Sequence, residues 1–475
     1  METIIKAGNL VIPYGRITRA DIHVKGEKIF AVSESIEDLE GKRVIDAKGK
    51  FVFPGLIDPH VHLGNTFPFL EDVQSETPCA AAGGVTTILV FLKAALFAPG
   101  FPSYREIFDT VLKDISGLAS VDFSFHFHIP ADTYIDEIPG YHKDYGIQSF
   151  KFYTVYKPSE KGSKDEYVAK RLQKISPGID DGVIYEILKK MGQTSPSPLA
   201  LVHAEADEII TRTTKTAQQA GLLGLKAWDA ARPDFAEEMA IIRVGYLARK
   251  TNAPIYIVHT SSALGLEAVR NEKRLGAQII AETCPHYLAL THEKTNEALE
   301  TFAKVSPPIR RRADVEALWE GIKQGEISCV GTEHSAKPKH AKTKDIWTSM
   351  LSGPGLETML PVMITEATKR HISLTKISEV CSYNTARIFD LFPDKGMIAP
   401  GCDADLVVVD VDKELEIKAE NLRSISGFTQ FEGKKARGWP ILTMLRGKVI
   451  YENGNLVEKG WGKFVPRFPG GEEYK

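Results

Sequence analysis

The sequence predicts a (β/α)8 barrel of the TIM type with a small β-sandwich domain formed by both chain ends. Eight apolar segments of strand length recur through the middle of the chain, each separated from the next by enough residues for a helix. Short apolar runs bounded by turn residues occupy both ends instead. The length of 475 residues suits one large and one small domain, because barrels alone exceed about 200 residues.

Both ends of the chain predict short antiparallel strands, since apolar runs alternate there with glycine, asparagine and proline. The runs cover residues 3–6, 10–12, 20–24, 28–32, 405–409, 442–445 and 447–451. We therefore expect residues 1–53 and 398–458 to form one β-sandwich domain, and residues 459–475 to form a C-terminal tail.

The middle of the chain, residues 54–397, predicts the barrel. Its strand candidates are residues 55–62, 86–92, 123–129, 149–156, 199–205, 254–261, 278–284 and 327–334. Helical stretches such as residues 234–249 and 314–324 lie between them. An open doubly wound sheet is the alternative. No Gly-x-Gly-x-x-Gly sequence opens a unit, which counts against a dinucleotide-binding sheet.

Composition excludes several classes of protein. Hydrophobic residues make up 43% and charged residues 25%, which is globular usage and not that of a disordered, collagen-like or coiled-coil chain. The net charge of -3 and the lack of an apolar run of about 18 residues lead us to expect no nucleic-acid and no membrane partner. Five scattered cysteines without a Cys-x-x-Cys pair favour a reducing, cytoplasmic location.

Potential metal ligands lie near the carboxyl ends of five predicted strands, where barrels build their active sites. They are His60, His62, Lys151, His203, His259 and Glu333. His60 and His62 are two positions apart on one strand, so both can face the barrel mouth and bind a divalent metal.

Two other features of the sequence give weaker evidence of a functional role. The pair His126 and His128 is expected to be structural, packed or hydrogen-bonded on the third strand. The charged residues 157–174 are expected to form a solvated loop and helix face, with a lid over the pocket as the alternative.

The segment Gly55-Leu56-Ile57-Asp58-Pro59-His60-Val61-His62 resembles the opening metal motif of the amidohydrolase superfamily. Within it the chain is similar, over nearly its whole length, to the hydantoinase/dihydropyrimidinase group and its relatives, the dihydroorotases and allantoinases. Further matching segments are Ser149-Phe150-Lys151, Val202-His203-Ala204-Glu205, Ile257-Val258-His259, Ser306-Pro307-Pro308 and Pro354-Gly355-Leu356-Glu357.

The resemblance implies a binuclear centre of two divalent ions, with zinc as the expected metal. His60 and His62 would bind one ion, and His203 and His259 the other. Lys151 would be N-carboxylated and bridge both ions. This modification is physically reasonable, because two dications repel an ammonium group and attract the two oxygens of a carbamate.

The resemblance also implies roles around the centre. Tyr156 would stabilise the oxyanion and bind substrate, with an aromatic pocket wall as the alternative. Ser306 would bind substrate. Glu333 stands where the family has an aspartate that binds metal and shuttles a proton. Glutamate is longer than aspartate by one methylene. Either the local backbone shifts to accommodate the longer side chain, or the site is weakened.

Two further departures concern the substrate. No asparagine precedes Pro354, where hydantoinases commonly hold the substrate ring, and Gly64 stands where dihydroorotases have an arginine. The apolar residues Phe67 and Phe69 follow, so we expect them to contact a cyclic imide or ureide with an apolar substituent. Simple packing of this loop is the alternative.

The expected activity is metal-dependent hydrolysis of a cyclic amide C–N bond, of the hydantoinase/dihydropyrimidinase type, by a metal-bridging hydroxide. An allantoinase-like or dihydroorotase-like hydrolase is one alternative. A catalytically silent homologue with an assembly role is another. We expect a homo-oligomer, with tetramer and dimer both open.

Overall fold

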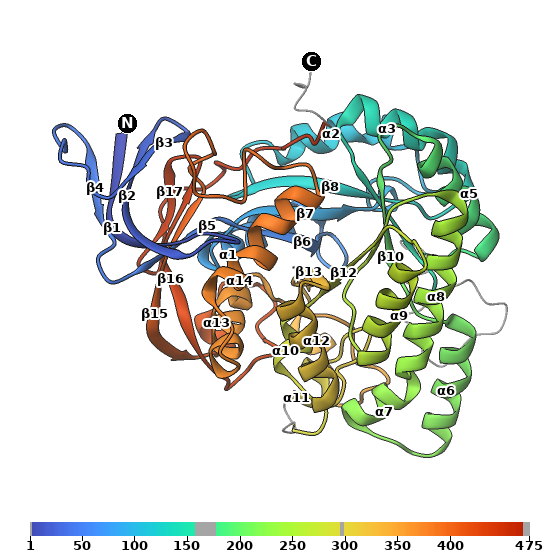
Figure 1. Cartoon of the computed structure of the whole chain (residues 1–475). Helices are drawn as coiled ribbons and strands as arrows, with labels where there is room; N and C mark the ends of the chain where they lie inside the picture. Colours follow the sequence, from blue (N-terminus) through green and yellow to red (C-terminus); the bar gives the residue numbers. More distant parts are fainter. Residues whose placement is uncertain (1, 157–176, 295–298, 469–475) are drawn as a thin grey trace.

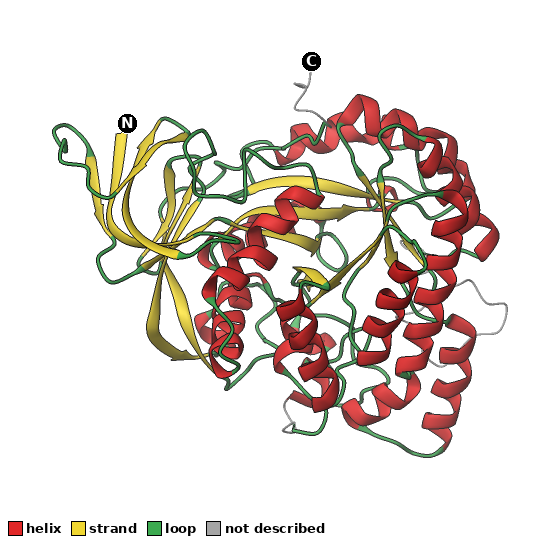
Figure 2. Cartoon of the chain, viewed as in Figure 1, coloured by secondary structure: helices red, strands yellow, loops and turns green. Residues whose placement is uncertain are grey.

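Two sheets organise the chain in the computed structural model, which describes residues 2–156, 177–294 and 299–468 (Figure 1). One is a mixed sheet made from both chain ends, and the other is the parallel sheet of a barrel surrounded by helices (Figure 2). No helix among the described residues is long and apolar enough to cross a membrane.

The mixed sheet has the strand order β18-β17-β16-β15-β5-β1-β2-β3, with β4 paired to β1. Its strands are β1 (Glu2–Val11), β2 (Ile17–Lys25), β3 (Lys28–Ser33), β4 (Arg43–Asp46), β5 (Phe51–Pro54), β15 (Leu406–Glu416), β16 (Lys435–Leu445), β17 (Lys448–Glu452) and β18 (Asn455–Leu456). The two chain ends join where β5 pairs antiparallel with β15. The exact domain limits stay a prediction.

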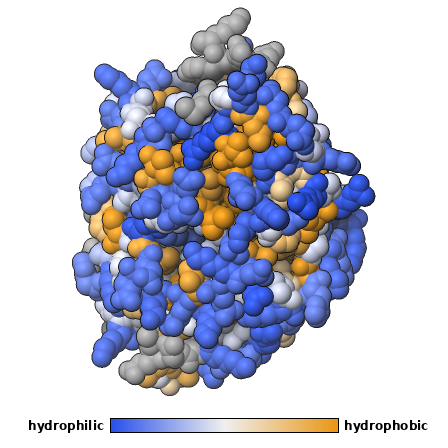
Figure 3. Space-filling view, turned by 90° about the vertical axis from the view of Figure 1, so that its left-hand side faces the viewer, coloured by the Kyte–Doolittle hydropathy of each residue, from blue (hydrophilic) through white to orange (hydrophobic). Residues whose placement is uncertain are grey.

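On the side of the molecule that carries the mixed sheet, hydrophobic side chains gather between hydrophilic ones (Figure 3). Exposed apolar residues of its strands include Phe30 and Val44, while Ile22, Val24 and Val408 lie in a core cluster of their own. This pattern is typical of a sheet that packs one face and leaves part of the other to solvent.

The barrel strands are parallel and follow chain order, which confirms the predicted fold class. They are β6 (Leu56–His62), β7 (Val85–Leu92), β8 (Asp122–His128), β9 (Ser149–Tyr153), β10 (Leu199–His203), β11 (Ile255–Ile257), β12 (Ile279–Thr283), β13 (Ile327–Val330) and β14 (His334–Ser335). The first three, β6, β7 and β8, are buried along their whole length, as expected for parallel strands covered on both faces.

The eighth strand differs from its prediction because residues 331–333 interrupt it. The segment before the break, β13, pairs with β12, and the segment after it, β14, pairs with the first strand, β6. The sheet therefore closes into a barrel across a three-residue interruption, and Glu333 lies within that interruption.

The described α-helices lie around the barrel (Figure 2). They are α1 (Phe69–Ala82), α2 (Tyr104–Ile115), α3 (Ile138–Tyr145), α5 (Asp181–Gln193), α6 (Asp207–Gln219), α7 (Gly224–Ala231), α8 (Asp234–Thr251), α9 (Ala263–Arg274), α10 (Pro285–Ala289), α11 (Leu299–Phe302), α12 (Arg312–Gln324), α13 (Met359–Lys369), α14 (Leu374–Ser378) and α15 (Asn384–Ile388). The predicted helices 234–249 and 314–324 correspond to α8 and α12. Each ends at a residue in the left-handed region, Asn252 or Gly325, as helix C-termini commonly do.

The C-terminal segment packs against the start of β8. The amide of Val465 donates to the carbonyl of Phe123 at 2.8 Å, and Arg467 is fully buried. The Arg467 guanidinium donates to Ser124 Oγ at 3.0 Å and to Ser149 Oγ at 2.9 Å. Ser149 Oγ in turn contacts His126 Nδ1, so the tail supports the barrel strands from inside.

We expect Arg467→Met to destabilise the protein, because it leaves buried hydroxyl groups without their charged partner. A loss of about 2 kcal/mol would lower the thermal unfolding midpoint by a few degrees. Lys463→Met in the same segment is the control, since the Lys463 side chain is 57% exposed and should contribute little. Equal midpoints for the two variants would show that the buried arginine does not stabilise the barrel.

Candidate metal centre

One half of the candidate centre comes from the first and eighth strands. His60 and His62 lie on β6 with both rings buried and their centroids 5.2 Å apart. Ligand atoms of His60, His62 and Glu333 all lie within 4.8 Å of one another. This is a compact set of two imidazoles and one carboxylate, a donor set that divalent metals prefer.

The other half comes from the fifth and sixth strands. His203 ends β10, His259 follows β11, and their nitrogens Nδ1 and Nε2 face each other at 2.9 Å. The rings of His60 and His259 stack with centroids 5.4 Å apart, which brings the two halves together. Lys151 on β9 is buried, with Nζ 5.0 Å from the Phe91 ring centroid. The structure thus brings all six predicted ligands to one end of the barrel.

Several buried atoms of this centre have no hydrogen-bond partner among the described residues. They are His60 Nε2, His62 Nδ1 and Lys151 Nζ. Buried polar atoms in folded proteins are nearly always hydrogen-bonded, so a concentration of unsatisfied nitrogens needs an explanation. A bound divalent cation, with a carboxylated Lys151, would provide one. The residues present therefore fit a metal centre.

Burial sets the protonation states that metal binding needs. It lowers the pKa values of His60, His62 and His259 well below the ordinary range, so these imidazoles are neutral and keep a lone pair. Burial also lowers the pKa of Lys151 to about 7 and raises that of Glu333 to about 7. A neutral lysine amine is the form that can react with CO2.

Glu282 at the end of β12 is a residue that the sequence analysis missed. Its carboxylate accepts a hydrogen bond from His60 Nδ1 at 2.6 Å, from the backbone amide of His259 at 2.9 Å and from the Tyr256 hydroxyl at 2.9 Å. A His60 that donates from Nδ1 keeps the lone pair on Nε2, as in carboxylate–histidine–metal arrangements. The sequence signal that could have identified Glu282 was its position as an acidic residue at the end of a predicted strand.

Glu205 orients His203 in the second half of the centre, as Glu282 orients His60 in the first. Its Oε2 accepts from His203 Nε2 at 2.6 Å, from Arg232 at 2.9 Å and from Ser306 Oγ at 3.0 Å. Burial would raise the pKa of this carboxyl, but the charge of Arg232 and the His203 contact outweigh it and lower the pKa to about 2. The sequence motif contained Glu205, but no role was predicted for it.

Three site residues adopt backbone conformations that side-chain-bearing residues rarely adopt. The φ angles of Tyr156, His259 and Glu333 are +66°, +42° and +53°. Surrounding bonds hold two of them in place: the Tyr156 amide donates to Asp207 Oδ1 at 2.8 Å, and the His259 amide donates to Glu282. Such conformations cluster at functional sites because only a supporting network can maintain them.

Tyr156 and Ser306 lie together beside the second half of the centre. The Tyr156 hydroxyl donates to Ser306 Oγ at 2.9 Å, and the Tyr156 ring centroid lies 5.7 Å from that of His203. Phe69 lies elsewhere: it begins α1, belongs to the main core and packs against Phe97. Phe67 is half-buried in the preceding loop. Substrate contact by either phenylalanine stays a prediction.

The two histidines of the second pair, His126 and His128, differ in their hydrogen bonds. His126 makes two hydrogen bonds, as a structural residue does: Nε2 donates to the Pro59 carbonyl at 3.0 Å, and Nδ1 accepts from Ser149 Oγ at 2.5 Å. His128 is buried and its Nε2 has no partner among the described residues. The charged stretch 157–174, with its alternative as a lid, lies outside the described residues.

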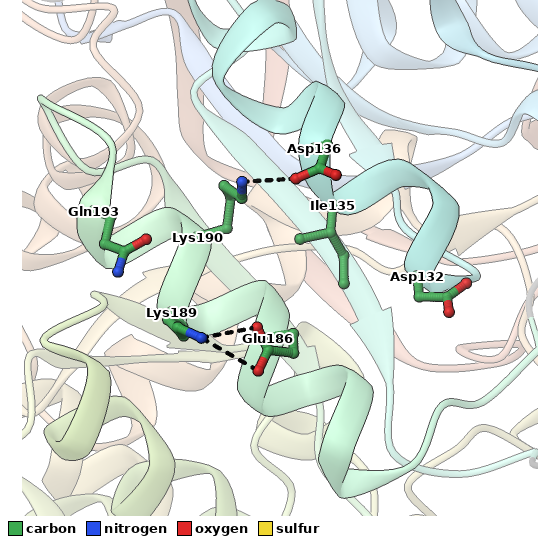
Figure 4. A pocket seen from close by; sticks show the side chains of 7 residues that line it. All are labelled: Asp132, Ile135, Asp136, Glu186, Lys189, Lys190 and Gln193. Atoms are coloured by element: carbon green, nitrogen blue, oxygen red, sulfur yellow. Dashed lines mark hydrogen bonds and ion pairs between the residues drawn. The ribbon is translucent and has the colours of Figure 1, made fainter.

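A surface hollow of about 320 Å³ lies away from this centre, between η2 (Asp132–Glu137) and α5 (Figure 4). Its lining is ion-paired: Lys190 contacts Asp136 at 2.7 Å, and Lys189 contacts Glu186 at 3.2 Å. These pairs are exposed and contribute little. The hollow contains none of the predicted site residues.

Comparison with known proteins agrees with this geometry. Residues 230–450 match the model of the amidohydrolase family. The chain is 33% identical over 477 residues to an L-hydantoinase of Paenarthrobacter aurescens, covering 98% of both chains. It is 31% identical to an allantoinase of Salmonella choleraesuis, again over 98% of both. A solved L-hydantoinase (dihydropyrimidinase) from Arthrobacter aurescens superposes with a TM-score of 0.87 at 30% identity, covering 98% of this chain and 99% of that one. The chain belongs to the amidohydrolase family and, within it, to the hydantoinase/dihydropyrimidinase group.

Proposed function

We propose that the protein hydrolyses a ring C–N bond of a small cyclic ureide or imide, in the manner of a hydantoinase or dihydropyrimidinase, and releases an N-carbamoyl amino acid. The observation that carries this proposal is the convergence of six buried ligands, several with unpartnered nitrogens, at one end of the barrel. The similarity to hydantoinases over nearly the whole chain supports the same reaction.

His60, His62 and Glu333 would hold one divalent ion, His203 and His259 the second, and a carboxylated Lys151 would lie between them. Zinc is the expected metal. When bound, the two ions would lower the pKa of a water towards about 7 and polarise the substrate carbonyl. Glu282 and Glu205 orient the histidines through their outer nitrogens, which fixes where the ligand atoms point.

Glu333 is suited to move a proton. Its carboxylate is buried, accepts from Ser352 Oγ at 3.2 Å and has a pKa raised to about 7 by burial. It would take a proton from the attacking water and give it to the leaving ring nitrogen. The closeness of its carboxylate to His60 and His62 supports the view that the interrupted strand absorbs the additional methylene.

Tyr156 and Ser306 would hold the substrate carbonyl on the other side of the centre. The Tyr156 hydroxyl now donates to Ser306 Oγ, and by rotating it can donate to an oxygen that gains negative charge during attack. Burial raises the pKa of Tyr156 to about 12, so the hydroxyl keeps the proton that this role needs.

Allantoinase-like and dihydroorotase-like hydrolysis are the alternatives within the same chemistry, and an allantoinase is among the relatives. A homotetramer or homodimer remains our expectation for the assembly. A cytoplasmic location also remains our expectation, supported by five buried cysteines that form no disulfide.

Ring opening of hydantoin, dihydrouracil, allantoin and dihydroorotate by protein loaded with metal and bicarbonate tests the proposal. We expect measurable ring opening of hydantoin and dihydrouracil. If none of the four rings is opened by protein that contains metal, the proposed function is wrong.

We expect protein prepared with Zn²⁺ and bicarbonate to contain about two metal ions per chain, by elemental analysis. Lys151→Ala should lower this content and abolish ring opening, because the group bridging both ions is lost. Lys143→Ala, at an exposed position on α3, is the matched control. One ion or fewer in the natural protein under these conditions would contradict the binuclear centre.

Glu333→Gln should lower kcat by 100-fold or more, since it keeps the shape of the side chain and removes the base. Glu333→Asp should also be impaired, because the site accommodates the longer side chain. Glu320→Gln on the exposed face of α12 should leave kcat unchanged. A fully active Glu333→Gln enzyme would remove Glu333 from the mechanism, and an aspartate variant faster than the natural enzyme would show that the glutamate weakens the site.

A further inference from the structure

Lys93 is a buried cation beside the metal centre. It directly follows β7, is only 2% exposed, and donates from Nζ to Asn65 Oδ1 at 2.7 Å. Asn65 lies three residues after His62, in the loop that leaves the first barrel strand. The mouth ends of the first and second strands are therefore joined through this ammonium group.

Lys337 reaches the same loop from the eighth strand. It lies four residues after Glu333, is 5% exposed, and donates from Nζ to Thr66 Oγ1 and Ser335 Oγ, both at 2.9 Å. Asn65 Nδ2 lies 3.5 Å from the same Ser335 Oγ. Lys93, Asn65, Ser335, Lys337 and Thr66 thus form one chain of hydrogen bonds that contains two positive charges.

This chain borders the first half of the metal centre. Ser335 pairs with His62 in the register of β14 and β6, and Asn65 and Thr66 continue the chain beyond His62. Lys93 and Lys337 are joined to these residues through Asn65 and Ser335, so both ammonium groups lie at the same edge of the barrel mouth as His62. A substrate at the centre would therefore have two cations along one edge.

Two more lysines lie behind Lys337. Lys342 is buried, and its Nζ donates to the backbone carbonyl of Lys304, which is itself buried. Burial and the charges of Lys304 and Lys337 lower the pKa of Lys342 well below its ordinary range, so Lys342 itself adds little positive charge. Lys93, Lys337 and Lys304 remain, and cations gathered in a region of low dielectric create a positive potential that attracts an anionic ligand.

The position that carries an arginine in dihydroorotases cannot supply such a charge in this protein. Gly64 has a φ of +79°, and a Cβ atom there would lie 2.9 Å from Leu96 Cδ1. From the missing arginine and the apolar loop, the sequence analysis expected a substrate with an apolar substituent. Lys93 and Lys337, which come from other barrel loops, favour an acidic substituent instead.

We propose that this edge of the site binds a carboxylate substituent of the substrate, so that the preferred substrates are cyclic ureides with an acidic side group. Lys93 and Lys337 would form charge-assisted hydrogen bonds with the carboxylate, while Asn65, Thr66 and Ser335 hold the two ammonium groups in position. The proposal rests on the proposed ring hydrolysis and adds the substrate class. Binding energy from a group remote from the reacting bond would position the ring for attack.

A matched pair of substrates tests it: hydantoin-5-acetic acid and its uncharged amide, hydantoin-5-acetamide. We expect the natural enzyme to have a kcat/KM at least tenfold higher for the acid. Lys93→Met and Lys337→Met should each lower this acid-to-amide ratio tenfold or more, because methionine keeps the length of the side chain and removes its charge. Lys189→Met, in the exposed hollow of Figure 4, should leave the ratio unchanged.

Salt dependence and direct binding give independent readouts. Added KCl should raise KM for the acid more than for the amide, since salt screens the charge contact. By calorimetry, N-carbamoyl-aspartate should bind the natural protein more tightly than N-carbamoyl-asparagine, and Lys337→Met should remove this difference.

An acid-to-amide ratio near one in the natural enzyme would overturn the proposal. So would a ratio that survives both lysine substitutions, which would show that these residues only brace the loop. Ring opening of the amide or of hydantoin with no preference for the acid would leave the hydrolase activity standing and reject the carboxylate site. Opening of none of these rings, together with equal calorimetric affinities for the two N-carbamoyl compounds, would reject both.

Discussion

The Glu282 carboxylate lies where strands β6, β11 and β12 meet, and it holds one ligand of each half of the metal centre. One of its oxygens contacts both the His60 ring and the His259 backbone amide, and the other accepts from Tyr256. Burial raises its pKa to about 7, so these three bonds must compensate for keeping a carboxylate out of water. Through this one side chain the His60 ring is oriented and linked to the backbone of His259, which belongs to the other half of the centre.

The positive and negative charges buried at the metal centre must nearly cancel. Burial lowers the pKa values of His60 and Lys151, which reduces the cost of burying cations, and Glu205, with its lowered pKa, supplies negative charge. With two divalent ions bound, a carbamate, Glu333 and a hydroxide would offset most of the added charge. The unusual backbone angles of Tyr156 and His259 are stable within this network because hydrogen bonds from their amides to Asp207 and Glu282 hold them.

The sequence predicted the features that depend on local pattern. Strand ends mark the barrel mouth, and alternation along β6 places His60 and His62 on one face, so the residues that gather there could be proposed as ligands from the sequence. Glu282 was missed because its partner His60 is 222 positions away. Glu205 is only two positions from His203, but nothing in the sequence distinguishes an orienting carboxylate from any other acid. Phe69 shows the limit of a local argument: the sequence could not tell that the helix it begins packs its ring in the core, and its expected contact with substrate stays a prediction. The sequence also could not predict that Lys93 and Lys337 lie together near His62, because β7, β14 and the loop after β6 meet only in the folded barrel.

Anomalous diffraction from crystals grown with Zn²⁺ and bicarbonate tests the central claim most directly. The account predicts two zinc peaks, one at His60, His62 and Glu333 and one at His203 and His259, with density for a carboxylate extending from Lys151 Nζ between them. A single peak, or two peaks with an unmodified Lys151, would contradict the account of a lysine-bridged binuclear centre.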